Sequence, residues 1–203
     1  MQRMKELMEE KLKVNKKRLV VGISGASGAI LGIEILKLLG NNPEWESHLV
    51  ISKGGEMTID DETEYSLEEV TALADKVYDI KNIGASIASG TFKTEGMVIV
   101  PCSMKTVAGI ACGYSDNLLL RAADVTIKER RKLVLAVREA PLSTIHLRNM
   151  LTLAEAGAII IPPMVTYYSK PRNLEEMNRQ IAGRILDKFG IETSGFNRWG
   201  EDI

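Results

Sequence analysis

The sequence has few of the side chains that build metal centres and disulfide frameworks. Its 203 residues include two cysteines, Cys102 and Cys112, and two histidines, His48 and His146. The cysteines lie ten positions apart and the histidines are far apart, a spacing that fits neither a disulfide framework nor a zinc site. We therefore expect no metal in the functional site, and we expect both cysteines to be small buried side chains.

An excess of charge of either sign is also absent. Lys and Arg total 26 against 27 Asp and Glu, which gives a net charge of -1. Such a chain has no global field that would attract nucleic acid or an anionic membrane surface. No apolar run approaches the roughly 18 residues of a membrane span, and the first residues lack the apolar core of a signal peptide. We expect a cytoplasmic protein in which any phosphate site is local.

What the sequence does contain is an alternation of apolar, β-rich runs with segments of helical spacing. The apolar runs cover 18–23, 47–52, 96–101, 132–137 and 157–162. Helical spacing covers 27–40, 66–76, 103–128 with a break near Gly113, 143–156 and 173–189. This order predicts a three-layer αβα fold with an open parallel sheet, Rossmann-like or flavodoxin-like. Residues 1–17 are expected to form an amphipathic N-terminal extension, and 18–203 a single domain.

A glycine-rich turn follows the first apolar run, at "GISGASGA". Its spacing, G-x-x-G-x-x-G, is neither the G-x-G-x-x-G of a dinucleotide site nor a nucleotide triphosphate loop. The second run ends in Ser52, Lys53 and Gly54, without the acidic residue that would bind a ribose hydroxyl. The turn suits a monophosphate or a mononucleotide at a helix N-terminus, or it is a tight strand-to-helix turn without a ligand.

Polar residues also follow the third and fourth apolar runs. Ser103, Lys105 and Thr106 come after the third run, where they form either an ordinary helix cap or part of a ligand site. Arg138 and Glu139 come after the fourth run, either as a structural ion pair or as site residues. In open parallel sheets, ligands bind beyond the carboxyl ends of the strands, so these positions are the first candidates.

The segment after Ser115 carries a narrow polar stripe on an otherwise apolar helix. The stripe consists of Asn117, Arg121, Asp124 and Lys128. Because both of its flanks are apolar, we expect it to face a wet cleft or a subunit interface. Together with Arg138, Lys170 and Arg184, its cations exceed the number that one phosphate needs. Two phosphates would account for them better. The acidic run 60–64 is interpreted as solvated.

Taken together, these motifs resemble the UbiX-type flavin prenyltransferases, formerly described as octaprenyl-hydroxybenzoate or phenylacrylic acid decarboxylases. The resemblance covers about 18–200 and rests on long motifs: "GISGASGA", the stretch from "VPCSMKTVAG" to "AGAIIIPP", "YYSKP" and the closing "RWGE". It implies a flavodoxin-like fold shared with the flavin-dependent cysteine decarboxylases. It also implies a homo-oligomer, a dodecamer, with sites shared between subunits.

The resemblance further implies an activity. Such enzymes transfer a dimethylallyl group from dimethylallyl monophosphate to N5 and C6 of reduced FMN, without a metal. The prenylated FMN serves a separate UbiD-type decarboxylase, in ubiquinone biosynthesis or in the decarboxylation of aromatic acids. One phosphate site would then belong to FMN and the other to the prenyl donor.

Residue roles carry over from the resemblance position by position. FMN would be held by Gly25, Ala26, Ser27, Ser52, Ser103, Met104, Lys105, Thr106 and Arg138. The prenyl phosphate would be bound by Lys128, Tyr168 and Arg184, with Arg121 nearby. The catalytic residues would be Glu139, Glu62, Ser27 and Lys128. Glu62 belongs to the acidic run that composition alone assigns to solvent.

Two other functions remain as alternatives, and the sequence differs from the family pattern at two positions. The alternatives are an FMN-dependent decarboxylase of the cysteine-peptide type and a non-catalytic FMN carrier subunit. The first lacks its expected histidine base at a strand end, and the second would not need a second anion site. Ile83 stands where some family members have tryptophan, and Val137 stands where proline is common. The aromatic wall around the allyl group is therefore expected to be thinner here.

Overall fold

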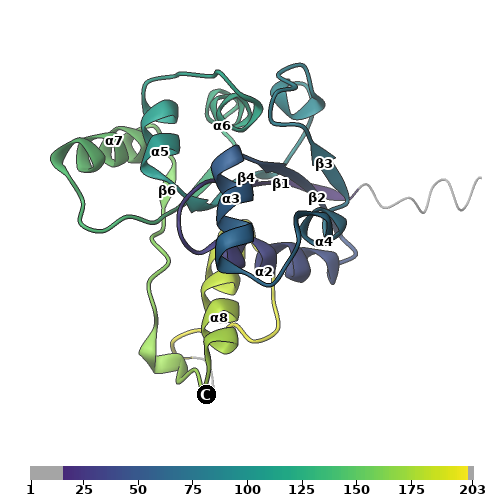
Figure 1. The fold of residues 1–203 in the computed structure, drawn as a ribbon, viewed down its shortest axis with the longest axis vertical. Helices are drawn as coiled ribbons and strands as arrows, with labels where there is room; N and C mark the ends of the chain where they lie inside the picture. Colours follow the sequence, from purple (N-terminus) through teal and green to yellow (C-terminus); the bar gives the residue numbers. More distant parts are fainter. Residues whose placement is uncertain (1–15, 201–203) are drawn as a thin grey trace, which may run out of the picture.

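The structure is a computed structural model that describes residues 16–200, and Figure 1 shows an open sheet between layers of helices. The strands are β1 (Lys17–Ile23), β2 (Trp45–Ile51), β3 (Lys76–Tyr78), β4 (Gly96–Cys102), β5 (Lys132–Val137) and β6 (Ile159–Ile160). The helices are α2 (Ala29–Gly40), α3 (Lys53–Glu62), α4 (Leu67–Ala72), α5 (Met104–Ala111), α6 (Leu118–Lys128), α7 (Thr144–Glu155) and α8 (Leu174–Leu186). Short 3-10 turns are η1 (Ser86–Ala88), η2 (Tyr167–Ser169) and η3 (Asp187–Phe189).

All pairings in the sheet are parallel, in the order β3-β2-β1-β4-β5-β6. Successive side chains of a strand point to opposite faces, so β1 supplies both cores. Leu19 and Val21 belong to the core under α2 and α8, whereas Val20 belongs to the core under α5 and α6. Burial on both faces explains why the strands are uniformly apolar, and it confirms the predicted three-layer parallel fold.

The two edge strands differ from the sequence prediction. β3 lies just after α4, where helical spacing was expected to continue to residue 76, and its "KVY" sequence lacks an apolar run. β6 has two residues, although the apolar run extends over 157–162. Its continuation reaches Pro162 and Pro163, which have no N–H to extend the ladder. Edge strands bury little side-chain area, so hydrophobic pattern places them poorly.

The predicted break near Gly113 is present, because α5 ends at Ala111 and α6 begins at Leu118. Gly113 adopts a φ of 70°, in the left-handed region that glycine favours. The predicted amphipathic helix at the N-terminus falls on 1–15, outside the described residues, and β1 begins next to the expected boundary at 17. The division into an extension and a single domain stays a prediction. Among the described helices, none is long and apolar enough to cross a membrane.

Candidate functional site

Predicted site residues from four strand ends line one cavity at the carboxyl edge of the sheet. We call it the strand-end cavity, and its volume is about 460 Å³, typical of a small-molecule site. The predicted residues that line it are Gly25, Ser52, Ser103, Met104, Lys105, Thr106 and Glu139. They follow β1, β2, β4 and β5, which are adjacent in the sheet in the order β2-β1-β4-β5. Ala26, Ser27 and Arg138 are chain neighbours of this lining.

The N-termini of three helices meet at the strand-end cavity. Ser52 caps α3, Ser103 caps α5 and Asn117 caps α6, and each side chain accepts a backbone N–H of its own helix at 3.1–3.3 Å. Helix N-termini carry partial positive charge and unpaired N–H groups, which favour an anion. The cavity therefore suits a phosphate. The sequence analysis placed Asn117 on the polar stripe but did not identify it as the N-cap of α6 in this cavity. An Asn immediately before an apolar helical segment is a pattern that predicts such a cap.

Ser24 ties the glycine-rich turn to the end of β4. This residue is 1% exposed, and its hydroxyl donates to the Pro101 carbonyl at 3.0 Å and accepts from the Ser103 N–H at 2.8 Å. On the other side, Gly25 approaches Gly54 so closely that a Cβ on Gly25 would lie 2.8 Å from the Gly54 Cα. These contacts explain why the turn needs a serine and a glycine in adjacent positions.

We expect Ser24→Ala to lower the free energy of unfolding by about 1–3 kcal/mol. The change removes two buried hydrogen bonds and leaves the Ser103 N–H without its acceptor. Denaturant unfolding of the variant measures the loss. Thr71→Ala, which removes a single bond from Thr71 to the Glu68 carbonyl on α4, serves as control and should cost about 0.5 kcal/mol or less. Equal losses in both variants would contradict the assigned role of Ser24.

Glu62 reaches the same turn from the end of α3. Its Oε2 accepts the backbone N–H of Gly28 at 2.8 Å, and Gly28 is the N-cap of α2 with a φ of 106°. The side chain is exposed, as the acidic composition of 60–64 predicts, yet it contacts the glycine-rich turn. Composition missed this contact because it depends on how α3 folds back over the turn. The resemblance assigned Glu62 to the catalytic residues because its position matches a family residue close to the reacting groups.

Arg138 and Glu139 follow β5 but are not paired with each other. Among residues 16–200, no ion pair within 4.0 Å joins them, so the alternative of a structural ion pair has no support. The Glu139 carboxylate accepts the Ala140 N–H at 3.0 Å and lines the strand-end cavity. The Arg138 N–H donates to the Cys102 carbonyl at 3.1 Å, and its side chain is exposed.

Tyr168 and Arg184 line a second cavity, between β6 and α8. We call it the β6–α8 cavity; its other walls are mainly apolar and include Ile160, Ile161 and Ile181. A phenol and a guanidinium above an apolar floor can bind a molecule with a charged head and a short hydrocarbon tail. α8 packs beside α2, on the opposite face of the sheet from α5 and α6, so the two cavities are separate within one chain.

Arg121 and Lys128 do not join either cavity. Arg121 donates to Asp124 at 2.7 Å on the surface of α6, and Lys128 contacts Glu129 at the end of that helix. Lys128 lies with Arg130 and Arg131 in a hollow beside the first residues of β5, at the amino edge of the sheet. The predicted set of prenyl-phosphate residues is therefore divided between separate places in a single chain.

His48 anchors the 80–95 loop, which reaches the strand-end cavity at Ile80. The histidine is 2% exposed; its Nδ1 lies 2.8 Å from the Tyr78 hydroxyl, which lies 2.8 Å from the Ser86 hydroxyl of the loop. Burial lowers the pKa of His48, and the Glu46 carboxylate, 3.6 Å from Nε2, only partly offsets this effect. The neutral imidazole is thus the form that the fold favours.

The lowered pKa of His48 predicts a stability that depends on pH. A histidine with a lower pKa in the folded state than its ordinary 6.5 stabilises the fold above pH 6.5, and this contribution is lost as pH falls towards the folded pKa. We expect the unfolding free energy of the natural chain to fall more steeply below pH 6.5 than that of His48→Gln. Parallel curves from denaturant titrations between pH 5 and pH 8, about the range of histidine titration, would contradict this assignment.

The cysteine prediction is half right. Cys102 is fully buried at the end of β4, and burial raises the pKa of its thiol. Cys112 is exposed in the turn after α5, so its predicted burial is wrong. Cys112 follows the last residue of the short helix α5, beyond the apolar face of that helix, and is therefore exposed. In the described part of the chain, no group of three or more His, Cys, Asp or Glu side chains could hold a metal ion.

Comparison with known proteins finds the same fold and relatives at about 50% identity. The flavoprotein family model matches residues 7–185. A probable UbiX-like flavin prenyltransferase of Sedimentibacter hydroxybenzoicus is 53% identical over 182 residues, 90% of this chain and 96% of that protein. The crystal structure of AnUbiX with FMN and dimethylallyl pyrophosphate matches with a TM-score of 0.89 at 48% identity, over 93% of this chain and all of that one.

Two further structures separate close relatives from proteins that share only the fold. A dodecameric FMN-dependent UbiX-like decarboxylase from Escherichia coli O157:H7 matches with a TM-score of 0.88 at 49% identity, over 90% of this chain and 98% of that one. The cysteine decarboxylase TvaF matches with a TM-score of 0.61 at 14% identity, over 72% of this chain and 90% of that one, which shows the fold alone. The chain belongs to the UbiX-type flavin prenyltransferases of the flavoprotein family.

Proposed function

We propose that this chain transfers a dimethylallyl group from dimethylallyl monophosphate to N5 and C6 of reduced FMN. The observation that carries the proposal is the strand-end cavity, where the N-termini of three helices meet beside the carboxylate of Glu139. The donor set fits a flavin mononucleotide, because hydroxyls and helix N–H groups bind one phosphate without a counter-ion.

The FMN phosphate binds among the hydroxyls of Ser52, Ser103 and Thr106, close to the glycine-rich turn. Lys105, on the rim, contributes a positive charge. The remaining residues of the FMN set are neighbours of this group in the turn and at the strand ends: Gly25, Ala26, Ser27, Met104 and Arg138. Reduced FMN, when bound, supplies the nucleophilic N5 and C6 positions that accept the dimethylallyl group.

The prenyl donor binds with its phosphate on Tyr168 and Arg184 and its hydrocarbon on the apolar wall of the β6–α8 cavity. Breaking the C–O bond leaves negative charge on the departing phosphate, which hydrogen-bond donors stabilise. Tyr168 and Arg184 donate to it from this chain. Because the two cavities are separate within one chain, the proposal places the donor bound by Tyr168 and Arg184 of one copy against the FMN bound in the strand-end cavity of a neighbouring copy. Lys128 and Arg121 would complete the donor set, also from another copy.

Glu139, Glu62 and Ser27 lie around the glycine-rich turn and the strand-end cavity. Closing the new ring at C6 requires removal of a proton, and the Glu139 carboxylate is an available base on the cavity wall. Glu62 holds the Gly28 N–H, and Ser27 precedes that residue, so both are placed to orient the reacting groups. The reaction as proposed needs no metal.

A homo-oligomer fits the surface of α7. Ile145, Leu147 and Leu151 are 52–66% exposed on this helix, which packs on α5 and projects from the body in Figure 1. Apolar side chains gathered on a projecting helix are typical of a protein interface. The proposed assembly is a dodecamer, as described for the UbiX-like relative, with sites shared between subunits.

Sharing of sites can be tested with mixed subunits. Lys128→Ala and Arg184→Ala chains should each have low activity at low donor concentration. If the two side chains meet from different copies, oligomers reassembled from equal amounts of both variants contain some complete sites, and activity should rise above that of either variant. Activity equal to the average of the two would contradict shared sites.

The function itself is tested by phosphate release. Anaerobic incubation of the protein with reduced FMN and dimethylallyl monophosphate should release inorganic phosphate, dependent on both substrates and unaffected by EDTA. Release without FMN would indicate a phosphatase, and loss of release in EDTA would contradict the metal-free mechanism.

A UbiD-type decarboxylase is the proposed acceptor of the product, and the cytoplasm is the proposed location.

A further inference from the structure

The C-terminal segment, residues 191–200, folds back along α8 and is held at several points. Ile191 is 1% exposed. A Cβ on Gly183 would lie 2.5 Å from the Phe196 Cβ, so the segment lies directly against the helix. Arg198 donates to Asp187 at 2.7 Å. The segment includes the start of the "RWGE" motif, which has no part in the cavities described above.

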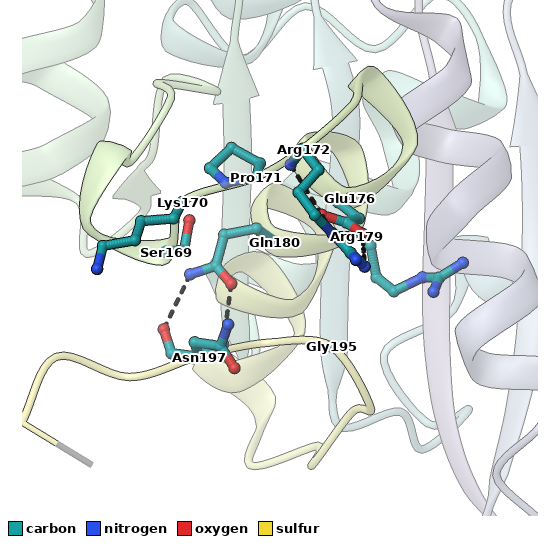
Figure 2. Close-up of a pocket in the computed structure, with 9 residues that line it drawn as sticks. All are labelled: Ser169, Lys170, Pro171, Arg172, Glu176, Arg179, Gln180, Gly195 and Asn197. Atoms are coloured by element: carbon teal, nitrogen blue, oxygen red, sulfur yellow. Dashed lines mark hydrogen bonds and ion pairs between the residues drawn. The ribbon is translucent and has the colours of Figure 1, made fainter. Parts of the chain in front are cut away.

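Both polar atoms of the Gln180 side-chain amide are hydrogen-bonded to this segment. Its Nε2 donates to the Asn197 carbonyl and its Oε1 accepts the Asn197 N–H, each at 2.9 Å, as Figure 2 shows. The side chain is 4% exposed, although Asn197 itself is exposed. Because both the nitrogen and the oxygen of this buried amide are paired, the Gln180 side chain fixes the main-chain position of Asn197. Loss of either bond would leave a buried polar atom of Gln180 unpaired.

The main-chain position that Gln180 fixes lies next to Tyr168. The Asn197 carbonyl also accepts the Tyr168 hydroxyl, at 3.5 Å, the length of a weak bond. Two residues later, the Trp199 ring stands edge-on to the Tyr168 ring, with centroids 5.3 Å apart and an interplanar angle of 83°. The segment therefore sets where the Tyr168 phenol lies in the β6–α8 cavity, beside Arg184.

We propose that Gln180 is a positioning residue that holds Tyr168 in place for the prenyl phosphate, acting through the main chain of Asn197. This inference rests on the proposed role of Tyr168 in phosphate binding. The phenol has one proton to donate, and its weak bond to Asn197 is readily exchanged for a bond to phosphate. The edge contact with Trp199 keeps the ring in place during that exchange.

The kinetic test compares Gln180→Leu with Asp187→Asn. Leucine removes both bonds to Asn197, whereas Asp187→Asn weakens the tie of Arg198 to the same segment without touching Asn197. We expect Gln180→Leu to raise the KM for dimethylallyl monophosphate roughly tenfold, with kcat and the KM for FMN within about twofold. Asp187→Asn should lower the melting temperature and leave both KM values unchanged.

Three kinetic outcomes are informative. A rise in donor KM in Gln180→Leu alone supports the positioning role. An unchanged donor KM, or an equal rise for FMN and for donor, overturns it. A natural chain that forms no prenylated flavin overturns the proposed function, and with it the assignment of Tyr168 to phosphate, whatever the variants do.

A second readout needs no turnover. The chain has two tryptophans: Trp45 is 4% exposed and Trp199 is 78% exposed. Subtracting the emission of the FMN-free Trp199→Phe variant from that of the FMN-free protein isolates the Trp199 signal. We expect Gln180→Leu to shift this signal, because the ring loses its fixed contact with Tyr168, and Asp187→Asn to shift it less. An unshifted signal in Gln180→Leu overturns the inference even where the enzyme is active.

Discussion

Replacing Glu139 by glutamine is expected to lower the rate of prenylated-flavin formation by about 10²- to 10⁴-fold, the usual contribution of a general acid or base. Glutamine has the same shape and keeps an oxygen that can accept the Ala140 N–H, so the cavity wall should not move. What is lost is the ability to take a proton during ring closure at C6. Single-turnover kinetics under anaerobic conditions, followed by flavin absorbance, measure the effect.

The accompanying measurement is FMN affinity, which should stay within about twofold, because the proposed site for the FMN phosphate consists of helix N-termini and does not include Glu139. Glu44→Gln provides a matched control: it changes an exposed carboxylate at the turn before β2, at the opposite edge of the sheet, and should leave the rate unchanged. A Glu139→Gln variant with a normal rate would remove this carboxylate from the mechanism.

The second large effect is expected at Arg184. Arg184→Ala should raise the KM for dimethylallyl monophosphate about 10- to 150-fold, the range expected for loss of a hydrogen bond between charged partners. The side chain lines the β6–α8 cavity and lies outside the strand-end cavity, so FMN affinity should change little. Steady-state kinetics at saturating FMN give the KM.

Arg184→Lys separates charge from geometry. Lysine keeps the positive charge but cannot form two parallel bonds to a phosphate, so its KM should lie between those of the natural chain and the alanine variant. If Arg184→Ala weakened the binding of FMN and of the prenyl donor equally, Arg184 would bind the FMN phosphate. The assignment of the two ligands to two separate cavities would then be wrong.

The sequence predicts the centre of the fold and of the site better than their edges. Central strands such as β1 and β4 are buried on both faces, so their apolar runs are unambiguous, and the positions after them are constrained by chain order. Sequence pattern therefore suffices to place Ser52, Ser103 and Glu139 at one edge of the sheet. β3 has no apolar run and was not predicted, whereas β6 was predicted from an apolar run longer than the two residues that form the strand.

The contacts that the sequence could not supply depend on packing between distant segments. In the sequence, Glu62 is one of several carboxylates in an acidic run. Its hydrogen bond to the Gly28 N–H forms because α3 packs back over the glycine-rich turn. Lys128 lies on the same stripe as Asn117, but α6 runs from the carboxyl edge of the sheet to the amino edge. That length separates Lys128 from the strand-end cavity.

The most direct test of the central claim is the mass of the flavin that the protein produces. The protein is incubated anaerobically with reduced FMN and dimethylallyl monophosphate in EDTA, and the extracted flavin is analysed by mass spectrometry. We predict a flavin heavier than FMN by one isoprene unit. Unmodified FMN, bound but unchanged, would contradict the prenyltransferase assignment.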